Sequence, residues 1–307
     1  MRRSRPSKPF EERVQATRMF HDWLGMMARI ALSGYATVDF IARANGPITP
    51  VGTNEVEVEH SGWPRGGGAP LYAGDVLARS GHEVALICSL GDDHGGGVYL
   101  DQIRHRKLST GTIEVVAGAR TPACVLIHQA GGGYCCFLDS GSDWDGLLTV
   151  KQHEAVDRAD WLVVTAGPVK LTTRVLEQAR ADQKIAWLVK ADRRSFPEGV
   201  VEKLKARADV IFCNRHEHGF LFADGNGALG SDKILFETDG AKGVRIVKGT
   251  DSIHCHTNSI DVSDATGAGD TFAGGALSVL ISDFTKLVSA AKAGMYAAAG
   301  LLEKRLR

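Results

Sequence analysis

The chain has no excess of charge of either sign. Its 307 residues contain 36 Lys and Arg and 36 Asp and Glu, which gives a formal net charge of zero. A chain without a net positive field has no general attraction for nucleic acid or for anionic membranes. It also lacks any run of 18 apolar residues, the length that a membrane-spanning helix needs. We therefore expect neither a nucleic-acid partner nor a membrane partner.

Three common active-site motifs are also missing. The dipeptide Gly-Lys does not occur, which excludes the G-x-x-x-x-G-K-[ST] loop of P-loop enzymes. No G-x-G-x-x-G follows the first expected strand, and there is no G-x-S-x-G elbow. These absences argue against a P-loop enzyme, a dinucleotide oxidoreductase and a serine hydrolase.

The six cysteines do not have the spacing of a metal or redox motif. No C-x-x-C occurs, and most of the cysteines lie inside apolar runs such as 85–90 and 210–214. This pattern indicates free thiols in a reducing compartment rather than disulfides or a zinc site. We therefore expect a cytoplasmic protein.

The first 27 residues lack the pattern of a folded element. They are basic at the front, are interrupted by acidic residues such as Glu11 and Glu12, and contain no apolar stretch of a secretory signal. We interpret residues 1–27 as an N-terminal extension outside the fold, with Met26 or Met27 as a candidate start of the chain. Residues 28–307 are then expected to form one domain.

Glycine, in contrast, is abundant. The 36 glycines are about 12% of the chain, against an average near 7%. With only nine prolines, this excess does not indicate a low-complexity linker. It indicates many places where the backbone turns sharply or approaches something closely.

The order of the hydrophobic patterns predicts an α/β fold. Short apolar runs that begin at Arg29 alternate with amphipathic helical segments, and two alanine-rich helices follow from Ala268 to the end. Such alternation is typical of a mostly parallel sheet covered by helices on both faces. The half-exposed strands at about 44–64 and 110–140 are expected to form a small β flap at the edge of that sheet. We expect the 230s to be helical.

The stretch 263–272, SDATGAGDTF, is the most informative part of the chain. Gly267 and Gly269 let the backbone approach a ligand, and the following residues continue as a helix. Free N–H groups at a helix N-terminus, together with the helix dipole, bind anions. Asp270 lies in the first turn, where a carboxylate can accept the proton of a hydroxyl that attacks a bound phosphorus. An anion site beside a base predicts phosphoryl transfer.

The same stretch resembles the signature of the ribokinase-like (PfkB) carbohydrate and nucleoside kinases, and the resemblance extends over about residues 28 to 300. It implies a three-layer α/β/α fold with a small β-strand lid, and ATP and Mg²⁺ as cofactors. Asp270 would be the general base, and Gly267, Ala268 and Gly269 would form the anion hole. A possible homodimer through the lid is also implied.

Other positions match further motifs of this family. Asp39, Gly67 and Gly68 resemble its substrate-binding residues. Asn214-Arg215-His216-Glu217 matches its N-x-x-E motif, which implies that Asn214 and Glu217 organise Mg²⁺, often through water. Lys248-Gly249 resembles its turn beside the nucleotide, and Thr266 belongs to the anion loop. Asp264 is interpreted as a helix cap, with the alternative that its backbone helps to hold a monovalent cation such as K⁺, as in some relatives.

The chain departs from the family pattern where substrate binds. Tyr72 stands where relatives commonly have Asn, and an aromatic ring can stack on a sugar face or a base but lacks the amide's two-way hydrogen bonding. The run Asp192-Arg193-Arg194 lacks the Asn of a common family motif. We predict a carbohydrate kinase that phosphorylates a hydroxyl of a small sugar. A nucleoside kinase, or a member of the fold that binds a metabolite without catalysis, remains as the alternative.

Overall fold

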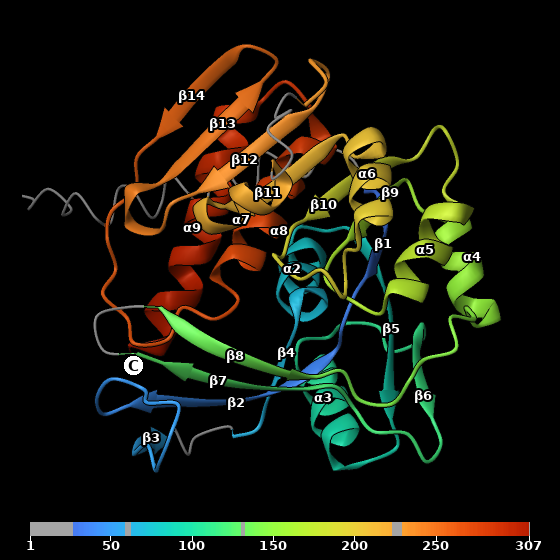
Figure 1. Ribbon diagram of the computed structural model, residues 1–307. Coiled ribbons are helices and arrows are strands. Elements are labelled where there is room, and N and C mark those ends of the chain that lie inside the picture. The colour runs from blue at the N-terminus through green and yellow to red at the C-terminus, as the bar shows by residue number, and fades with distance from the viewer. Residues whose placement is uncertain (1–26, 59–62, 130–132, 223–228, 307) are drawn as a thin grey trace, which may run out of the picture.

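The computed structural model describes residues 27–58, 63–129, 133–222 and 229–306 (Figure 1). The expected N-terminal extension therefore lies almost entirely outside the described residues, as do Gly131 and Gly132 within the lid stretch expected at about 110–140. None of the helices in the described residues is long and apolar enough to cross a membrane.

A nine-stranded sheet forms the body of the molecule. Its strand order is β14-β13-β12-β11-β10-β9-β1-β5-β6, and the seven strands from β12 to β6 run parallel. The strands span, in that order, Asp251–Cys255, Val244–Lys248, Ile234–Thr238, Val210–Asn214, Lys184–Leu188, Trp161–Val164, Arg29–Ser33, Glu83–Gly91 and Ile113–Val116. Strand β13 is antiparallel to both of its neighbours.

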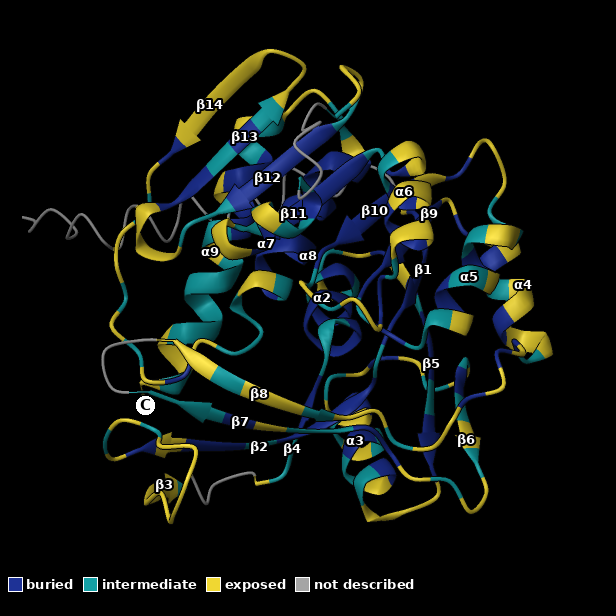
Figure 2. Cartoon of the chain, in the orientation of Figure 1, coloured by how far each residue is buried: buried dark blue, intermediate teal, exposed yellow. Residues whose placement is uncertain are grey.

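Two separate hydrophobic cores cover the two faces of this sheet, because alternate residues of each strand point to opposite sides. In β1, Ile30 and Leu32 belong to one core and Ala31 to the other. The first core packs under helices α2 (Ala69–Arg79), α3 (His94–His105), α8 (Ala268–Ser282) and α9 (Leu287–Arg305). The second packs under α4 (Val150–Arg158), α5 (Val169–Gln178), α6 (Glu198–Arg207) and α7 (Arg215–Leu221). The buried sheet between exposed helix surfaces is visible in Figure 2. The expected three-layer α/β/α fold is confirmed.

A second, five-stranded sheet lies beside the carboxyl ends of the main strands (Figure 1). It contains β2 (Thr37–Ala44), β3 (Val56–Val58), β4 (Arg65–Gly67), β7 (Ala123–His128) and β8 (Tyr134–Asp139). Strand β2 is its centre, pairing with β3, β4 and β7. We call this sheet the lid. Its central strand follows β1 after a turn of only three residues, so the lid is built directly onto the middle of the main sheet.

Two expectations about the strands were wrong. Residues 113–116 do not belong to the lid, because β6 pairs in parallel with β5 at the edge of the main sheet. The 230s are not helical, because Ile234–Thr238 forms the buried strand β12. An apolar run of five residues lacks a decisive period, and pairing with β11 determines its conformation.

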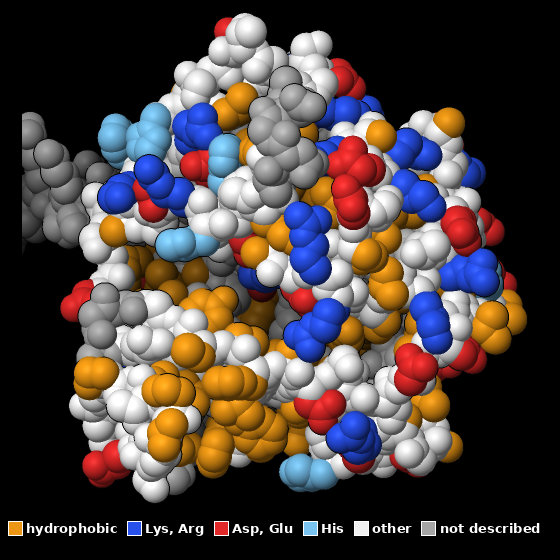
Figure 3. Space-filling view, in the orientation of Figure 1, with side chains coloured by type: hydrophobic (Ala, Val, Ile, Leu, Met, Phe, Trp, Pro, Cys, Tyr) orange, Lys and Arg blue, Asp and Glu red, His pale blue; other side chains and the backbone are white. Residues whose placement is uncertain are grey.

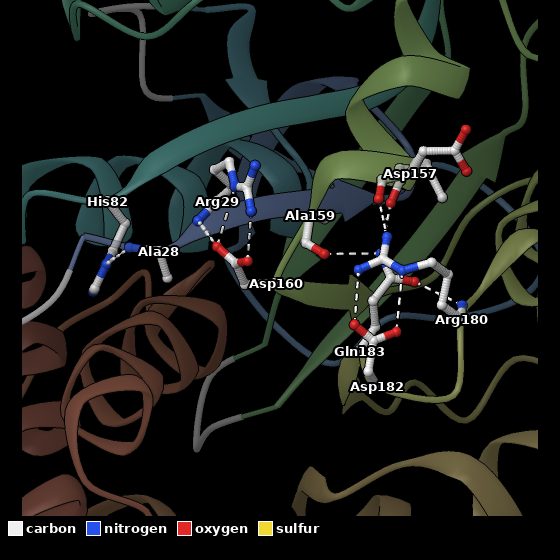
Figure 4. Close-up of polar contacts among 10 residues, drawn as sticks. Ala28, Arg29, His82, Asp157, Ala159, Asp160, Arg180, Asp182 and Gln183 are labelled. Atoms are coloured by element: carbon white, nitrogen blue, oxygen red, sulfur yellow. Dashed lines mark hydrogen bonds and ion pairs between the residues drawn. The ribbon is translucent and has the colours of Figure 1, made fainter.

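Polar contacts tie the strands together at the edge opposite the lid (Figure 4). The backbone N–H of Arg29 and its guanidinium both donate to the carboxylate of Asp160, at 2.8 and 2.9 Å. Gln183, which precedes β10, donates to the carbonyl oxygens of Val156 and Ala159 at 2.7 and 2.8 Å. These bonds stabilise the register of β1, β9 and β10. The register in turn sets the positions of the residues at the carboxyl ends of these strands.

Candidate active site

A cleft of about 1370 Å³ separates the carboxyl edge of the main sheet from the lid. Figure 3 shows it as a hollow between the two parts of the molecule. Five neighbouring strands contribute residues at or just after their ends, namely Tyr35, Thr165, Lys190, Asn214 and Thr238. Because the strands are parallel, these ends meet on one side, where ligands bind in open α/β sheets.

The N-terminus of α8 points an unpaired backbone into this cleft. Gly267 is the N-cap residue in the left-handed conformation, with φ of 77°. The N–H of Ala268 donates to the carbonyl of Ala265, but no hydrogen bond in the described chain uses the N–H groups of Gly269 and Asp270. Gly267, Gly269 and Asp270 all line the cleft, whereas Ala268 does not. Fifteen residues of helix stand behind this site, so its dipole favours an anion there.

Asp39 faces the anion site from the lid side of the cleft. It lies on β2, is 3% exposed, and accepts a hydrogen bond of 2.8 Å from the hydroxyl of Thr37. Burial raises the pKa of its carboxyl to about 6, against the opposing effects of Thr37 and Arg65. Gly67 lies against the Asp39 carboxylate, where a Cβ would collide with it, and Gly68 borders the cleft. These residues form a buried hydrogen-bonding acceptor for a polar substrate.

Tyr72 borders the cleft and packs beneath the anion loop. It is on α2, is 4% exposed and lines the cleft, but its ring packs against the backbone of Gly267. Burial raises the pKa of its phenol, so the ring remains neutral. Tyr72 therefore supports the anion loop, and little of its ring is available to a ligand.

Asn214 and Glu217 form a capping box at the start of α7. The Asn214 side chain accepts from the N–H of Glu217, and Glu217 Oε2 accepts from the N–H of Asn214, both at 2.9 Å. The N-x-x-E spacing thus has a structural reason of its own, since it satisfies two donors of the helix end. Glu217 Oε1 is left for other partners and lies 3.8 Å from Nζ of Lys190. Burial raises the pKa of the Glu217 carboxyl although Lys190 opposes the shift.

Asp264 is the centre of a charged cluster beneath the anion loop. Its carboxylate contacts Arg65 of β4 at 2.6 Å, Arg305 of α9 at 3.2 Å and His128 of β7 at 3.3 Å. It also accepts the N–H of Thr266 at 2.9 Å. Burial opposes ionisation, but these partners outweigh it and hold the pKa of Asp264 well below its usual range. The cluster joins the lid, the anion loop and the last helix.

The expectation for Lys248 and Gly249 was wrong. Lys248 pairs with Ile234 at the beginning of β12, because β13 runs antiparallel to its neighbours. The last residues of β13, and the Lys248-Gly249 turn with them, therefore lie at the edge of the sheet opposite the cleft. Thr238 and Gly240, which follow β12, line the cleft instead. Because the 230s were expected to be helical, the sequence did not predict a strand that ends at Thr238.

Asp192 borders the cleft, but its carboxylate holds its own turn. It accepts from the N–H of Arg194 and the hydroxyl of Ser195, both at 3.0 Å.

Sequence reasoning missed Lys190, two residues before Asp192, and the inner face of the lid. The lid residues that line the cleft are Cys124, Leu126, His128, Tyr134, Cys136 and Leu138. Alternation along 123–128 and 134–139 was the signal for this shared face, because paired residues of β7 and β8 point the same way.

An anion site at a helix N-terminus, a carboxylate in its first turn and a buried polar acceptor across a lidded cleft are the parts of a small-molecule kinase. Residues 27–306 match the pfkB family of carbohydrate kinases, and the chain belongs to this family. It is an ATP-dependent carbohydrate kinase, as the sequence resemblance implied.

Similarity to individual proteins is distant but extends over most of their length. The chain is 22% identical to ribokinase of Bacillus subtilis, over 80% of this chain and 83% of that protein. It is 26% identical to ATP-dependent ribose-1-phosphate kinase of Halopiger xanaduensis, over 84% and 86%. Among solved structures, ribokinase from Cryptococcus neoformans in complex with ADP superposes with a TM-score of 0.74 at 18% identity, over 90% of this chain and 94% of that one.

Proposed function

We propose that this carbohydrate kinase transfers the γ-phosphoryl group of ATP to a hydroxyl of a small sugar held between Asp39 and Asp270. One observation carries the proposal: Asp270 stands in the first turn of α8, beside unpaired backbone N–H groups, and lines the same cleft as Asp39. The anion site and the base thus adjoin one cavity that also holds a substrate acceptor.

Each side chain has a distinct task in this proposal. The N–H groups at Gly267–Gly269 bind the transferred phosphoryl group and stabilise the charge on its oxygens. Asp39 accepts a hydrogen bond from a sugar hydroxyl and orients the ring. Asp270 accepts the proton of the attacking hydroxyl as the new O–P bond forms and the bond to the β-phosphate oxygen breaks. The inner face of the lid excludes water, which would otherwise compete as acceptor.

The residues present fit a magnesium ion held mainly by phosphates. Mg²⁺ in kinase sites usually keeps several waters and takes only one or two carboxylates from the protein. Glu217 Oε1 is free of the capping box, and Asn214 borders the cleft, which supports these two residues as its water-mediated partners. When bound, Mg²⁺ neutralises phosphate charge. Thr266 borders the anion loop, and Thr238 and Gly240 replace Lys248 and Gly249 as the proposed nucleotide contacts.

The environment of Tyr72 favours a sugar over a nucleoside. A nucleobase that stacked on Tyr72 would need an open ring face, but this ring is 4% exposed and packs against Gly267. The names of the two relatives, ribokinase and ribose-1-phosphate kinase, support a pentose or its phosphate as the first substrates to test.

ATP consumption against a panel of pentoses, hexoses, pentose phosphates and nucleosides tests the proposal. We expect turnover with one sugar class and turnover on the order of 10³-fold lower in Asp270→Asn, because a positioned general base contributes about 10²–10⁴-fold to the rate. Asp251→Asn, an exposed change on β14, is the matched control and should behave as wild type. Full turnover by a folded Asp270→Asn protein would overturn the role of Asp270. Turnover only with nucleosides would establish the alternative substrate class, and tight sugar binding without ATP consumption would indicate a non-catalytic protein.

We further propose that the outer face of the lid joins two copies of the chain. Val125 and Phe137 are 42% and 60% exposed on this sheet, and Trp63, just before β4, is 43% exposed. Hydrophobic side chains gather over the lid in Figure 3. An exposed apolar sheet face of this kind is typical of a protein interface. Light scattering after size exclusion should give a dimer mass for the wild type and a monomer mass for Phe137→Glu; a wild-type monomer would contradict the proposal.

Two further proposals concern the extent of the domain and the compartment of the protein. Residues 28–307 form one kinase domain that includes the lid, and limited proteolysis should leave this unit intact while removing residues 1–27. The six cysteines are free thiols, which supports the reducing environment of the cytoplasm.

A further inference from the structure

A single lysine lies between the two carboxylates of the phosphate side of the cleft. Lys190 follows β10, and the N–H of the preceding residue, Val189, donates to the carbonyl of Phe212 at 2.9 Å. Its Nζ is 3.8 Å from Glu217 Oε1 and 4.0 Å from Asp270 Oδ1. One cation from a strand end thus faces the first turns of both α7 and α8.

No other Lys or Arg of the described chain forms an ion pair with either carboxylate. The negative charge of Asp270 raises the pKa of Lys190, burial opposes this, and Glu217 adds to the rise. The ammonium therefore keeps its proton. Its side chain is 42% exposed and borders the cleft, so it is free to move toward a ligand.

Lys190 is placed to offset the repulsion between the terminal phosphate of ATP and the carboxylates of Asp270 and Glu217. The terminal phosphate of ATP must approach the N-terminus of α8, where Asp270 and Glu217 place two negative charges close to it. Like charges at such distances oppose binding unless a cation offsets them. Lys190 is within reach of both carboxylates, and its distances of 3.8 and 4.0 Å are longer than direct charged hydrogen bonds. The two carboxylates therefore position the ammonium electrostatically, and its N–H groups remain able to donate hydrogen bonds to a ligand.

We propose that Lys190 is a further catalytic residue, whose ammonium leaves Asp270 and Glu217 to contact the γ-phosphoryl group of bound ATP. This inference rests on the proposed function of the same cleft. Lys190 keeps its proton throughout, while Asp270 receives the proton of the attacking hydroxyl and the β-phosphate oxygen takes the electron pair of the broken bond. The lysine stabilises the charge on the transferred group and prevents Asp270 from repelling it.

A purely structural ion pair would have different consequences, and two nucleotides separate the cases. ADP lacks the γ-phosphate, whereas the non-hydrolysable analogue AMP-PNP carries its counterpart. Titration calorimetry with Lys190→Met should show AMP-PNP bound about tenfold more weakly than to the wild type while ADP is bound within about threefold, because only the former presents the group that the ammonium contacts. A structural role would weaken both nucleotides equally or neither.

Kinetics supply the second measurement. Lys190→Met should lower kcat by about 10²-fold, the usual cost of one donor to a transition-state oxyanion, and Lys190→Arg should recover part of it because the charge is retained. Lys151→Met, an exposed change on α4, is the matched control. The proposal is overturned if a folded Lys190→Met retains kcat within threefold of wild type, or if ADP and AMP-PNP lose affinity alike. Loss of turnover in Asp270→Asn with full turnover in Lys190→Met would reject the lysine role alone.

Discussion

The ring of Tyr72 packs against Gly267 so closely that a Cβ at position 267 would lie 2.6 Å from two of its ring carbons. Gly267 also has a φ of 77°, which side-chain-bearing residues rarely adopt. One contact therefore explains two features of the chain: a tyrosine beneath the anion loop, and a glycine at the cap of α8. The loop conformation that exposes the N–H groups depends on both residues.

Gly267→Ala should consequently reduce phosphoryl transfer far more than it reduces stability. The new methyl group would strain the backbone by about 1–2 kcal/mol and displace the Tyr72 ring or the loop. We expect kcat to fall by at least about 10²-fold, because a misplacement near 1 Å has that effect on positioned groups. Steady-state kinetics and thermal unfolding measure the two effects. Gly300→Ala, where a Cβ meets nothing within 4 Å, is the control and should not lower either quantity.

Asp39→Asn should stabilise the protein at neutral pH while impairing sugar binding. Burial raises the folded-state pKa of Asp39 to about 6, above its unfolded value of about 3.9. The folded protein thus binds this proton more tightly, and its stability falls as pH rises from about 4 through 6. A shift of this size corresponds to at most about 3 kcal/mol of destabilisation at pH 7 to 8.

The pH dependence makes the Asp39 prediction specific. Chemical unfolding should show Asp39→Asn more stable than wild type at pH 7.5, with most of the difference lost near pH 4 and the rest lost below about pH 3, where Asp39 is protonated in both folded and unfolded chains. The KM for the sugar should rise because the amide is a weaker acceptor than a carboxylate. An equal stability difference at both pH values would contradict the burial of an ionised Asp39.

The sequence predicted the parts of the site that depend on local pattern. The glycines and Asp270 of the anion loop lie within four consecutive residues, and the N-x-x-E motif is a capping box within one helical turn, so neighbours in the chain are also neighbours in space. The alternation of strands and helices likewise predicted the layers. In each case one segment determines the geometry.

Features that depend on pairing between distant segments were missed. The direction of β13 decides on which edge Lys248 lies, and nothing within residues 244–248 specifies that direction. The pairing of β10 with β11 brings the ammonium of Lys190 to Glu217 and Asp270, and no local pattern around residue 190 predicts that pairing. The cluster around Asp264 joins residues 199 and 41 positions away in the chain.

Asp264→Asn should destabilise the whole domain. Asp264 is 5% exposed and its carboxylate is the shared partner of Arg65 and Arg305, so removing the charge leaves two partly buried cations unpaired. Loss of one member of a buried pair costs about 3–5 kcal/mol, and for a domain of this size that lowers Tm by about 10 °C.

The pKa of Asp264 gives this effect a direction in pH. A folded-state pKa well below the usual range means that the stabilisation is complete above about pH 4 and is lost only as pH falls further. The Tm difference between wild type and Asp264→Asn should therefore be constant from pH 5 to 8, as differential scanning fluorimetry would show. Asp261→Asn, an exposed neighbour, is the control for this comparison of Tm. A difference under 2 °C would mean that the cluster is not a centre of stability.

Turnover should not require a monovalent cation, because Arg305 already occupies the backbone carbonyl of Asp264 at which the family resemblance implies a cation. Its Nη1 donates to the carbonyl oxygen of Asp264 at 2.8 Å and pairs with the carboxylate of the same residue. A K⁺ ion at that carbonyl would have to displace the guanidinium or lie against its positive charge. Exchange of K⁺ for tetramethylammonium at constant ionic strength should change kcat less than twofold. In Arg305→Ala the carbonyl and carboxylate become open to a cation, so this variant should gain stimulation by K⁺. Tenfold or greater activation of the wild type by K⁺ would show that the cation binds elsewhere or replaces Arg305.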